Sequence, residues 1–151
     1  MDEALTGSVN ETAPFGALLG IEWLAAGPDE VTARLAWDES RCTAGGVLHG
    51  GALMGLADSA GGLLAFLNLP EGATGTATIE SKTNFFAAVR GGHVHATARP
   101  LHKGRRTIVV DTDLRDDDGR LVARVTQTQA VLTSRRLDGG EQIAEGGGGG
   151  G

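Results

Sequence analysis

A single carboxylate stands inside a stretch of sequence that is otherwise apolar. Asp58 lies within residues 50–67, where leucine, alanine and glycine predominate. Burying an unpaired carboxylate costs free energy, so such a residue indicates either a functional acid or a structural hydrogen-bond acceptor. A functional carboxylate in this setting acts as a nucleophile or as a general base toward water. Position alone gives the two interpretations of Asp58 equal weight.

The tripeptide His49-Gly50-Gly51 stands where a helix over this stretch would begin. The first N–H groups of a helix have no internal partner, and the helix dipole is positive there. Glycine also lets a substrate approach the backbone closely. The Gly50 N–H is therefore a candidate oxyanion donor. The alternative is that His49 only caps the helix and that the glycines only permit close packing.

The spacing of these two features has a structural consequence. Gly50 and Asp58 are eight residues apart, which is about 12 Å along a helix axis. One carbonyl group cannot touch both groups of the same helix. If both act on one substrate, they come from different subunits, with two helices antiparallel. The sequence thus predicts a homodimer with two composite sites and a monomer without activity.

The elements expected around the helix are mostly antiparallel strands. Apolar alternation and turn residues predict two short strands, then the helix, then four more strands. The expected strands cover residues 21–26, 31–37, 76–89, 93–98, 108–114 and 121–132. A short helix or turn is expected at 14–19, and a loop at 38–48. This order predicts an α+β fold in which one antiparallel sheet curls around a central helix.

Burial of the central helix and association of the sheet follow from the same pattern. The helix is apolar on nearly every side, which predicts burial on nearly every side. One helix cannot cover both faces of a sheet, so we expect one face to stay partly apolar. Association with a second copy would cover that face.

These residues and elements together resemble the hotdog-fold thioesterases, in particular the phenylacetate-pathway (PaaI-like) branch. The resemblance covers residues 14–132. It is carried by His49-Gly50-Gly51, by Leu56-Ala57-Asp58, and by segments 82–92 and 104–107. It implies a hotdog fold, an antiparallel sheet wrapped around one long central helix, and dimers that pair into homotetramers. It also implies hydrolysis of an acyl- or aryl-coenzyme A, with no cofactor because coenzyme A is part of the substrate.

The resemblance also assigns roles to catalytic residues. Asp58 serves as nucleophile or general base, and the Gly50 N–H polarises the thioester carbonyl. His49 helps to hold the loop and the substrate. A hydroxyl on the strand after the helix helps to position water, with Thr78 as the best match and Thr76 as the next.

Further residues are expected to contact the substrate. Family members often carry Asn or Gln six residues before the histidine, but Thr43 stands at that position here. The Thr43 hydroxyl can still donate a hydrogen bond, and Gly51 adds a backbone contact. Lys103, Arg105 and Arg106 flank a turn, where they form either a solvated hairpin tip or a cradle for the phosphates of coenzyme A.

Other candidate sites carry weaker signals. His93 and His95 lie on one face of a strand, which could suit a metal ion. No acid or cysteine joins them at a recognisable spacing, so we expect an exposed strand face and no metal site. Cys42 is the one cysteine, which excludes an internal disulfide framework. The acyl pocket is expected to include residues from both subunits, among them Leu63, Leu64 and Phe86.

Composition limits the partners and the compartment. The chain has 151 residues and a formal net charge of −6, which argues against nucleic acid as a partner. It has no apolar run long enough to span a bilayer and no secretion core after its acidic N-terminus, which favours the cytoplasm. The expected organisation is a flexible N-terminus at 1–12, a hotdog thioesterase domain at 13–134 and a flexible glycine-rich tail at 135–151.

Two other functions fit parts of this pattern. A hotdog hydratase acting on acyl thioesters would need an acid and a histidine placed together, whereas His49 is nine residues before Asp58. A non-catalytic acyl-CoA sensor would keep a basic patch and a pocket without needing Asp58. Hydrolysis of an acyl-coenzyme A remains the function that accounts for the acid.

Overall fold

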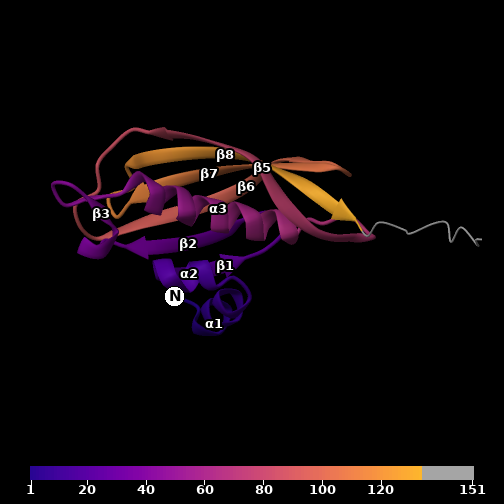
Figure 1. Cartoon of the computed structure of the whole chain (residues 1–151), viewed down its shortest axis with the longest axis horizontal. Coiled ribbons are helices and arrows are strands. Elements are labelled where there is room, and N and C mark those ends of the chain that lie inside the picture. The colour runs from indigo at the N-terminus through magenta and orange to yellow at the C-terminus, as the bar shows by residue number, and fades with distance from the viewer. Residues whose placement is uncertain (134–151) are drawn as a thin grey trace, which may run out of the picture.

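The computed structural model describes residues 1–133 of the chain. The expected tail at 135–151, and the last residue of the expected domain, lie outside the described residues. Within 1–133, one six-stranded antiparallel sheet has the order β1-β2-β6-β7-β8-β5 (Figure 1). Its strands are β1 (Ile21–Ala26), β2 (Val31–Ala36), β5 (Ala73–Phe85), β6 (His93–Lys103), β7 (Thr107–Asp116) and β8 (Leu121–Thr133).

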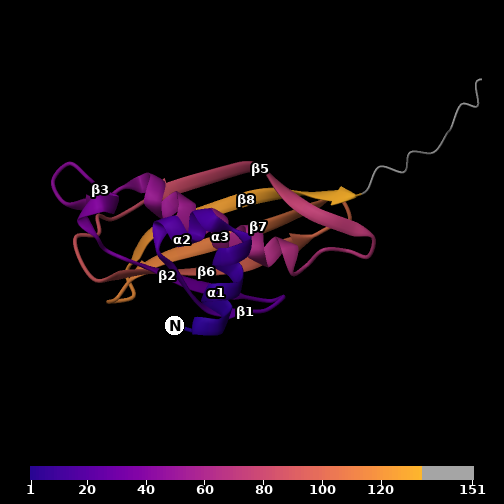
Figure 2. The same cartoon turned by 60° about the horizontal axis from the view of Figure 1, so that its bottom comes forward.

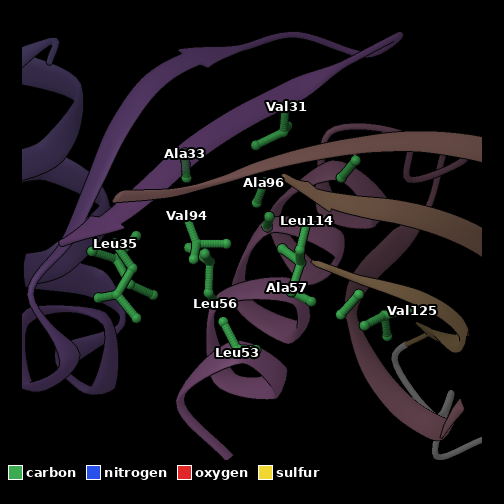
Figure 3. Close-up of a cluster of buried hydrophobic side chains, with 14 of the residues drawn as sticks. Val31, Ala33, Leu35, Leu53, Leu56, Ala57, Val94, Ala96, Leu114 and Val125 are labelled. Atoms are coloured by element: carbon green, nitrogen blue, oxygen red, sulfur yellow. The ribbon is translucent and has the colours of Figure 1, made fainter. Parts of the chain in front are cut away.

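One long helix, α3 (Gly50–Phe66), lies across this sheet and contacts all six of its strands (Figures 1 and 2). Its apolar face carries Leu53, Leu56 and Ala57, which point toward side chains of β6, β7 and β8 (Figure 3). Burial of these side chains stabilises the fold by roughly 25 cal/mol for each Å² of apolar surface removed from water. The expected α+β hotdog architecture, with a sheet around one central helix, is confirmed.

The expectation that α3 is buried on nearly every side is wrong. Gly51, Met54, Asp58 and Phe66 are exposed. Their spacing of three, four and eight residues places them along one side of the helix. The sheet covers only the opposite side, because a single layer cannot enclose a helix completely. The open stripe therefore contains Asp58 itself.

The outer face of the sheet, which was expected to stay partly apolar, carries several ion pairs. On β1 and β2, Glu22 and Arg34 form an ion pair at 2.7 Å. On β7 and β8, Asp113 pairs with Arg124 at 2.7 Å and with Arg115 at 2.9 Å. Alternate residues of these strands point away from α3, and polar side chains occupy those positions. Many of the exposed large apolar side chains lie on or next to α2, α3 and β5, at Phe15, Leu18, Met54, Phe66, Leu67, Ile79, Phe85 and Phe86. Leu101 of β6 and Leu132 of β8 are also exposed.

The N-terminal segment is ordered, so the expectation of a flexible stretch at 1–12 is wrong. Helix α1 (Glu3–Thr12) lies against β1, where Asp2 N–H donates to the Trp23 carbonyl at 2.9 Å. Thr6 Oγ1 accepts from Trp23 N–H at 3.0 Å, and Asn10 Oδ1 accepts from the Trp23 indole at 3.1 Å. The polar residues that suggested a solvated segment are therefore the hydrogen-bond partners that hold it in place.

Helix α2 (Pro14–Leu19) packs tightly against α3. A Cβ atom on Gly55 would lie 2.7 Å from Leu19 Cδ1 and 3.2 Å from Phe15 Cε1. A side chain at this position would force Leu19 and Phe15 to shift, so glycine suits the close approach of the two helices. The pair α1–α2 is thus fixed beside the central helix (Figure 2).

The segment at 38–48, expected as a loop, contains short elements. These are η1 (Glu39–Arg41), β3 (Cys42–Thr43) and β4 (Val47–Leu48), with β3 and β4 paired antiparallel. They lead directly into the start of α3. No helix in the described part of the chain is both long and apolar enough to cross a membrane.

Candidate active site

Three polar side chains, Thr78, Gln127 and Gln129, form a hydrogen-bonded network with Asp58. Its Oδ1 accepts a hydrogen bond from Thr78 Oγ1 at 3.1 Å and a longer one from Gln127 Nε2 at 3.4 Å. Thr78 Oγ1 in turn accepts from Gln129 Nε2 at 2.7 Å. Asp58 Oδ2 has no hydrogen-bond partner among residues 1–133. One carboxylate oxygen is therefore held in place, and the other remains available for chemistry.

The pairing of β5 with β8 builds this network. Thr78 stands opposite Gln129 in the antiparallel register. A β-bulge follows between Thr78 and Glu80, and beyond it Ser81 stands opposite Gln127. The inward positions of β8 alternate, so both glutamines point toward α3. The register of β5 on β8 thus positions the hydrogen-bond partners of Asp58, which lies on α3.

The absence of a side chain at Gly61 of α3 makes room for one of these amides. A Cβ atom on Gly61 would lie 2.6 Å from the side-chain carbon Cδ of Gln127. Glycine at this position lets the Gln127 amide lie directly beside α3, one turn from Asp58. Gln127 is fully buried, and its Oε1 has no partner in the described part of the chain. The amide is consequently supported through its N–H group alone.

Sequence reasoning missed Gln127 and Gln129. Both are buried, at 0% and 1% exposure. Buried polar side chains are almost always hydrogen-bonded, so they need partners nearby. The available signal was the alternation Val125, Gln127, Gln129 on the inward side of the last strand. Two amides at core positions indicate that a polar partner faces them.

The start of α3 holds the second half of the predicted site. His49 Nδ1 accepts a hydrogen bond from the Gly51 N–H at 2.8 Å, so the imidazole caps the helix. The Gly51 N–H, expected to contact substrate, is thereby occupied. The Gly50 N–H has no acceptor among the residues that the structure describes. Gly50 lies under Phe85, whose Cζ would be 3.0 Å from a Cβ placed there.

The Gly50 N–H and the Asp58 carboxylate are not brought together within one chain. Gly50 and Asp58 belong to the same uninterrupted α-helix, so about 12 Å of helix separates them. This arrangement agrees with the spacing argument from the sequence. A site that uses both groups has to draw them from two copies of the chain.

The remaining predicted residues fall into separate places. Thr76 lines the same cavity as Asp58 and Thr78. Thr43 is exposed in the β3–β4 hairpin and makes no hydrogen bond to Asp58 among residues 1–133. Leu63 lines the cavity as expected, whereas Leu64 is fully buried in the core.

The basic residues occupy the turn between β6 and β7. Lys103 Nζ donates to the Pro28 carbonyl at 3.0 Å and lies 3.4 Å from Asp29 Oδ1, so it ties this turn to the β1–β2 turn. Arg105 and Arg106 are exposed, and neither has an ion-pair partner within 1–133. The two arginines are therefore the cations of this turn that remain open to a ligand.

His93 and His95 have no acid at a recognisable spacing in the sequence, but the structure places one beside them. Asp117, from the β7–β8 turn, contacts His95 Nε2 at 2.8 Å and accepts from the His93 N–H at 2.9 Å. These hydrogen bonds, from His95 first and then His93, hold the pKa of Asp117 below its ordinary value. Across the described residues, no group of three or more His, Cys, Asp or Glu side chains is arranged to hold a metal ion.

A cavity of about 720 Å³ opens beside the Asp58 network. Asp58, Thr76, Thr78 and Gln129 lie along one part of its wall. Residues of α1, α2, β1 and the second half of α3 form most of the rest. Its size lies in the range that is usual for small-molecule sites, roughly 300–1,000 Å³. Phe86 is 58% exposed and does not line this cavity.

A hotdog sheet around a helix that carries one hydrogen-bonded carboxylate beside a cavity is the arrangement that the sequence predicts for a thioester hydrolase. The comparison with protein families agrees, because the profile of the thioesterase superfamily matches residues 45–123. The chain belongs to the thioesterase superfamily. The enzyme class expected from the sequence, a thioester hydrolase, is confirmed.

Individual relatives support the same class. The 1,4-dihydroxy-2-naphthoyl-CoA hydrolase of Escherichia coli K12 is 32% identical over 114 residues, which cover 76% of this chain and 83% of the relative. A solved mutant of thioesterase PA1618 from Pseudomonas aeruginosa is 32% identical, with a TM-score of 0.78 over 84% of this chain and 93% of that one. A solved mutant of the phenylacetic acid degradation protein PaaI from Thermus thermophilus is 28% identical, with a TM-score of 0.72 over 79% of this chain and 99% of that one. The resemblance to the PaaI-like branch is thereby confirmed.

Proposed function

We propose that this protein hydrolyses an acyl- or aryl-coenzyme A to the free acid and coenzyme A, at two composite sites of a homodimer. Asp58 of one subunit acts as nucleophile or general base, and the Gly50 N–H of the other donates to the oxyanion. One observation carries the proposal. Among residues 1–133 the Gly50 N–H and Asp58 Oδ2 have no hydrogen-bond partner, and the two groups stand on one continuous helix, too far apart to share a carbonyl.

An antiparallel pair of α3 helices determines which residue lies on the two-fold axis between Gly50 and Asp58. If Gly50 of one helix faces Asp58 of its partner, the midpoint of each helix faces its own copy. That midpoint is residue 54, halfway between 50 and 58. Met54 is a large apolar side chain that is 40% exposed. An exposed methionine at the expected two-fold axis supports the dimer, because self-contact would bury it.

Strand β5 offers the surface on which such a dimer can form. It contains 13 residues and lies at an edge of the sheet within residues 1–133. An edge strand this long presents unpaired N–H and C=O groups, which natural proteins usually cover. Ile79 and Phe85 of β5 are 63% and 50% exposed. Antiparallel pairing of two β5 strands would continue the sheet and place the two α3 helices side by side.

The proposed chemistry uses the free carboxylate oxygen. The thioester carbonyl oxygen accepts a hydrogen bond from the partner's helix start, where the dipole is also favourable. Asp58 Oδ2 then attacks the carbonyl carbon, which expels the coenzyme A thiolate and leaves a mixed anhydride for water to cleave. Alternatively, Oδ2 takes a proton from a water that attacks, and the tetrahedral intermediate collapses with loss of the thiolate. Thr78 and Gln127 hold Oδ1 in either case.

Other expected contacts enter as parts of the same proposal. Arg105 and Arg106 bind the phosphates of coenzyme A, because both are exposed and open in an otherwise acidic protein. Thr76 and Thr43 contact the substrate through their hydroxyls. Pairing of two dimers would give a homotetramer. A hydratase is disfavoured because no histidine is among the described hydrogen-bond partners of Asp58.

Mixed dimers test the composite site directly. Asp58→Asn removes the acid, and Gly50→Pro removes the N–H donor. Proline suits this position because it is the first residue of α3 and because His49 before it has an extended backbone, with φ −65° and ψ 136°. Gly50→Ala is the matched control, since it adds a Cβ beneath Phe85 but keeps the N–H. Asp118→Asn, in an exposed turn, is the control for loss of a carboxylate.

We expect each variant alone to lose activity on a panel of aromatic and aliphatic acyl-CoA esters. Mixing the two chains should restore roughly a quarter of wild-type activity, because half of random dimers are mixed and each holds one intact site of two. A site contained within one chain predicts no recovery, so a mixture that stays inactive would contradict the composite site. An Asp58→Asn protein that keeps full activity would disprove the role of Asp58.

A further inference from the structure

The cavity beside Asp58 is enclosed by two groups of elements. Helix α3 and strands β5 and β8 form the part of the wall that carries the acid. The rest comes from α1, α2 and Trp23 of β1. Most of the large side chains that line the cavity are apolar: Val9, Phe15, Trp23, Leu63, Phe66 and Leu67. A molecule beside Asp58 would therefore have α3 on one side and α1 on another, in mainly apolar surroundings.

Helix α1 buries little apolar surface compared with the other parts of this wall. None of the ten residues that the structure describes in α1 is fully buried, and Leu5 and Val9 are only partly buried against the core. The helix packs against β1 and α2. Segments with little buried apolar surface open at a lower free energy than the core of a fold. Helix α1 is therefore easier to detach than α3 or the sheet.

Two polar side chains attach α1 to β1, and both bind Trp23. Asn10 Oδ1 accepts from the Trp23 indole N–H at 3.1 Å, and Asn10 Nδ2 donates to the Ile21 carbonyl at 3.3 Å. Thr6 Oγ1 accepts from the Trp23 backbone N–H at 3.0 Å and donates to the Trp23 carbonyl at 3.4 Å. Trp23 also lines the cavity. The residue that anchors α1 is thus part of the cavity wall.

A single non-helical residue, Ala13, connects α1 to α2. Its φ of −125° and ψ of 81° end α1, and Pro14 after it has no N–H to donate back to α1. The Gly16 N–H bonds to the Ala13 carbonyl at 3.0 Å and not to a residue of α1. A change in the Ala13 dihedral angles would therefore turn α1 without breaking a described backbone hydrogen bond between the two helices.

We propose that α1 is a lid over the cavity beside Asp58. It turns about Ala13, and Thr6 and Asn10 hold it closed on Trp23. An apolar molecule enters and leaves the cavity when α1 lifts from β1. The effect of the lid on turnover rests on the proposed function, whereas access to the cavity requires no turnover.

Two substitutions weaken the attachment of α1 and keep the approximate shape of each side chain. Thr6→Val and Asn10→Leu remove hydrogen bonds to β1. Thr74→Val is the matched control, because the Thr74 hydroxyl also donates to a strand carbonyl, that of Leu132 at 3.3 Å, and Thr74 is not among the described lining residues. Amide hydrogen exchange should become faster in α1 of the first two variants and stay unchanged in β6 and β7, which shows that the sheet remains folded.

Entry into the cavity is measured with N-phenyl-1-naphthylamine, a neutral apolar dye whose fluorescence rises on binding. Stopped-flow mixing gives its association and dissociation rate constants. Both constants should rise about threefold or more in Thr6→Val and Asn10→Leu, and their ratio should change less, because a lid that opens more often admits and releases the dye faster. Thr74→Val should match the wild type.

A cavity-filling variant shows where the dye binds. A Cβ atom on Gly62 would have no heavy atom within 4 Å, and Gly62 lines the cavity. Gly62→Leu should therefore abolish the dye signal. A signal that Gly62→Leu leaves unchanged, or no binding to any of the proteins, would mean that the cavity does not admit the dye and would overturn the proposal. Faster exchange in α1 without faster entry and release would also overturn it, because α1 would then open without controlling access.

Acyl-CoA assays on the same proteins separate the lid from the proposed function. If no protein hydrolyses an ester while both dye rate constants rise in Thr6→Val and Asn10→Leu, the proposed function fails and the lid stands. If hydrolysis depends on Asp58 while the dye rate constants are the same in these variants and the wild type, the lid fails and the proposed function stands.

Discussion

The Thr78 hydroxyl donates a hydrogen bond to the Asp58 carboxylate across 3.1 Å, although 20 residues separate them in the chain. The same hydroxyl accepts from the buried Gln129 amide at 2.7 Å. Because a hydroxyl has one proton, the Gln129 donor directs that proton toward Asp58. Thr78 therefore links a core amide to an acid at the surface of the helix.

This link predicts the effect of changing Thr78. Thr78→Val keeps the shape of the side chain but removes the donor to Asp58 Oδ1. A hydrogen bond to a charged group contributes about 1.5–3 kcal/mol, so kcat should fall roughly tenfold to a hundredfold. Thr78→Ser restores the hydroxyl and should recover most of the rate. Steady-state kinetics on one good ester measures both variants, and an unchanged kcat in Thr78→Val would contradict the role.

Two adjacent glycines of α3 should respond oppositely to alanine. At Gly61 a Cβ would lie 2.6 Å from Gln127 Cδ, whereas at Gly62 it would meet nothing within 4 Å. Gly61→Ala should destabilise the protein by about 1–3 kcal/mol, because the buried amide has to move. Gly62→Ala should stabilise it by up to about 1 kcal/mol, because alanine favours helix. Urea unfolding monitored by circular dichroism gives both values, and equal effects would contradict the packing of Gln127 against α3.

The proposed two-fold axis predicts a charge-dependent assembly at Met54. Met54→Lys places like charges opposite each other in the dimer, and so does Met54→Glu. Each variant alone should dissociate more readily and lose activity with Asp58 intact. Mixing the two should restore both, because opposite charges then face each other. Analytical ultracentrifugation with parallel assays measures this, and a Met54→Lys dimer as stable as the wild type would place the axis elsewhere.

Acid should weaken the outer face of the sheet. Arg124 and then Arg115 donate to Asp113, which holds the pKa of Asp113 below its ordinary value. In the unfolded chain Asp113 takes up a proton at about pH 3.9, its ordinary value. In the folded chain Asp113 takes up this proton only at a lower pH. The stabilisation is therefore complete above about pH 3.9 and is lost as the pH falls through the folded pKa.

The measurement is urea unfolding of the wild type and Asp113→Asn between pH 7 and pH 3. The variant should be less stable at pH 7, and the difference in the free energy of unfolding should shrink toward pH 3. Asp118→Asn, in an exposed turn, should show no such difference. A gap between wild type and Asp113→Asn that stays constant with pH would contradict the ion-pair origin of the shift.

Local patterns in the sequence were enough to predict the main elements and to single out the acid of the proposed site. The apolar run after His49-Gly50 predicts α3, which begins at Gly50 as expected. Alternating residues and tight turns predict the strands within a few positions, because periodicity is set by neighbours in the chain. A lone acid in an apolar helix marks Asp58, and helix rise alone shows that Gly50 of the same chain cannot reach its carbonyl.

Features that depend on contacts between distant segments could not be obtained this way. The polar residues of α1 are hydrogen-bond partners of Trp23, and only the docked structure distinguishes them from solvated residues. The charged outer face of the sheet likewise depends on which side of each strand faces α3.

The sequence by itself determined the helix, the order of the strands along the chain and the position of the acid Asp58, because each is a property of a continuous segment. Only the tertiary structure decided what surrounds Asp58. Gln127 lies 69 residues away along the chain, and Thr78 meets Gln129 across a gap of 51. The register of β5 on β8 brings them together, and that register is fixed by packing of the whole sheet against α3 rather than by any local signal.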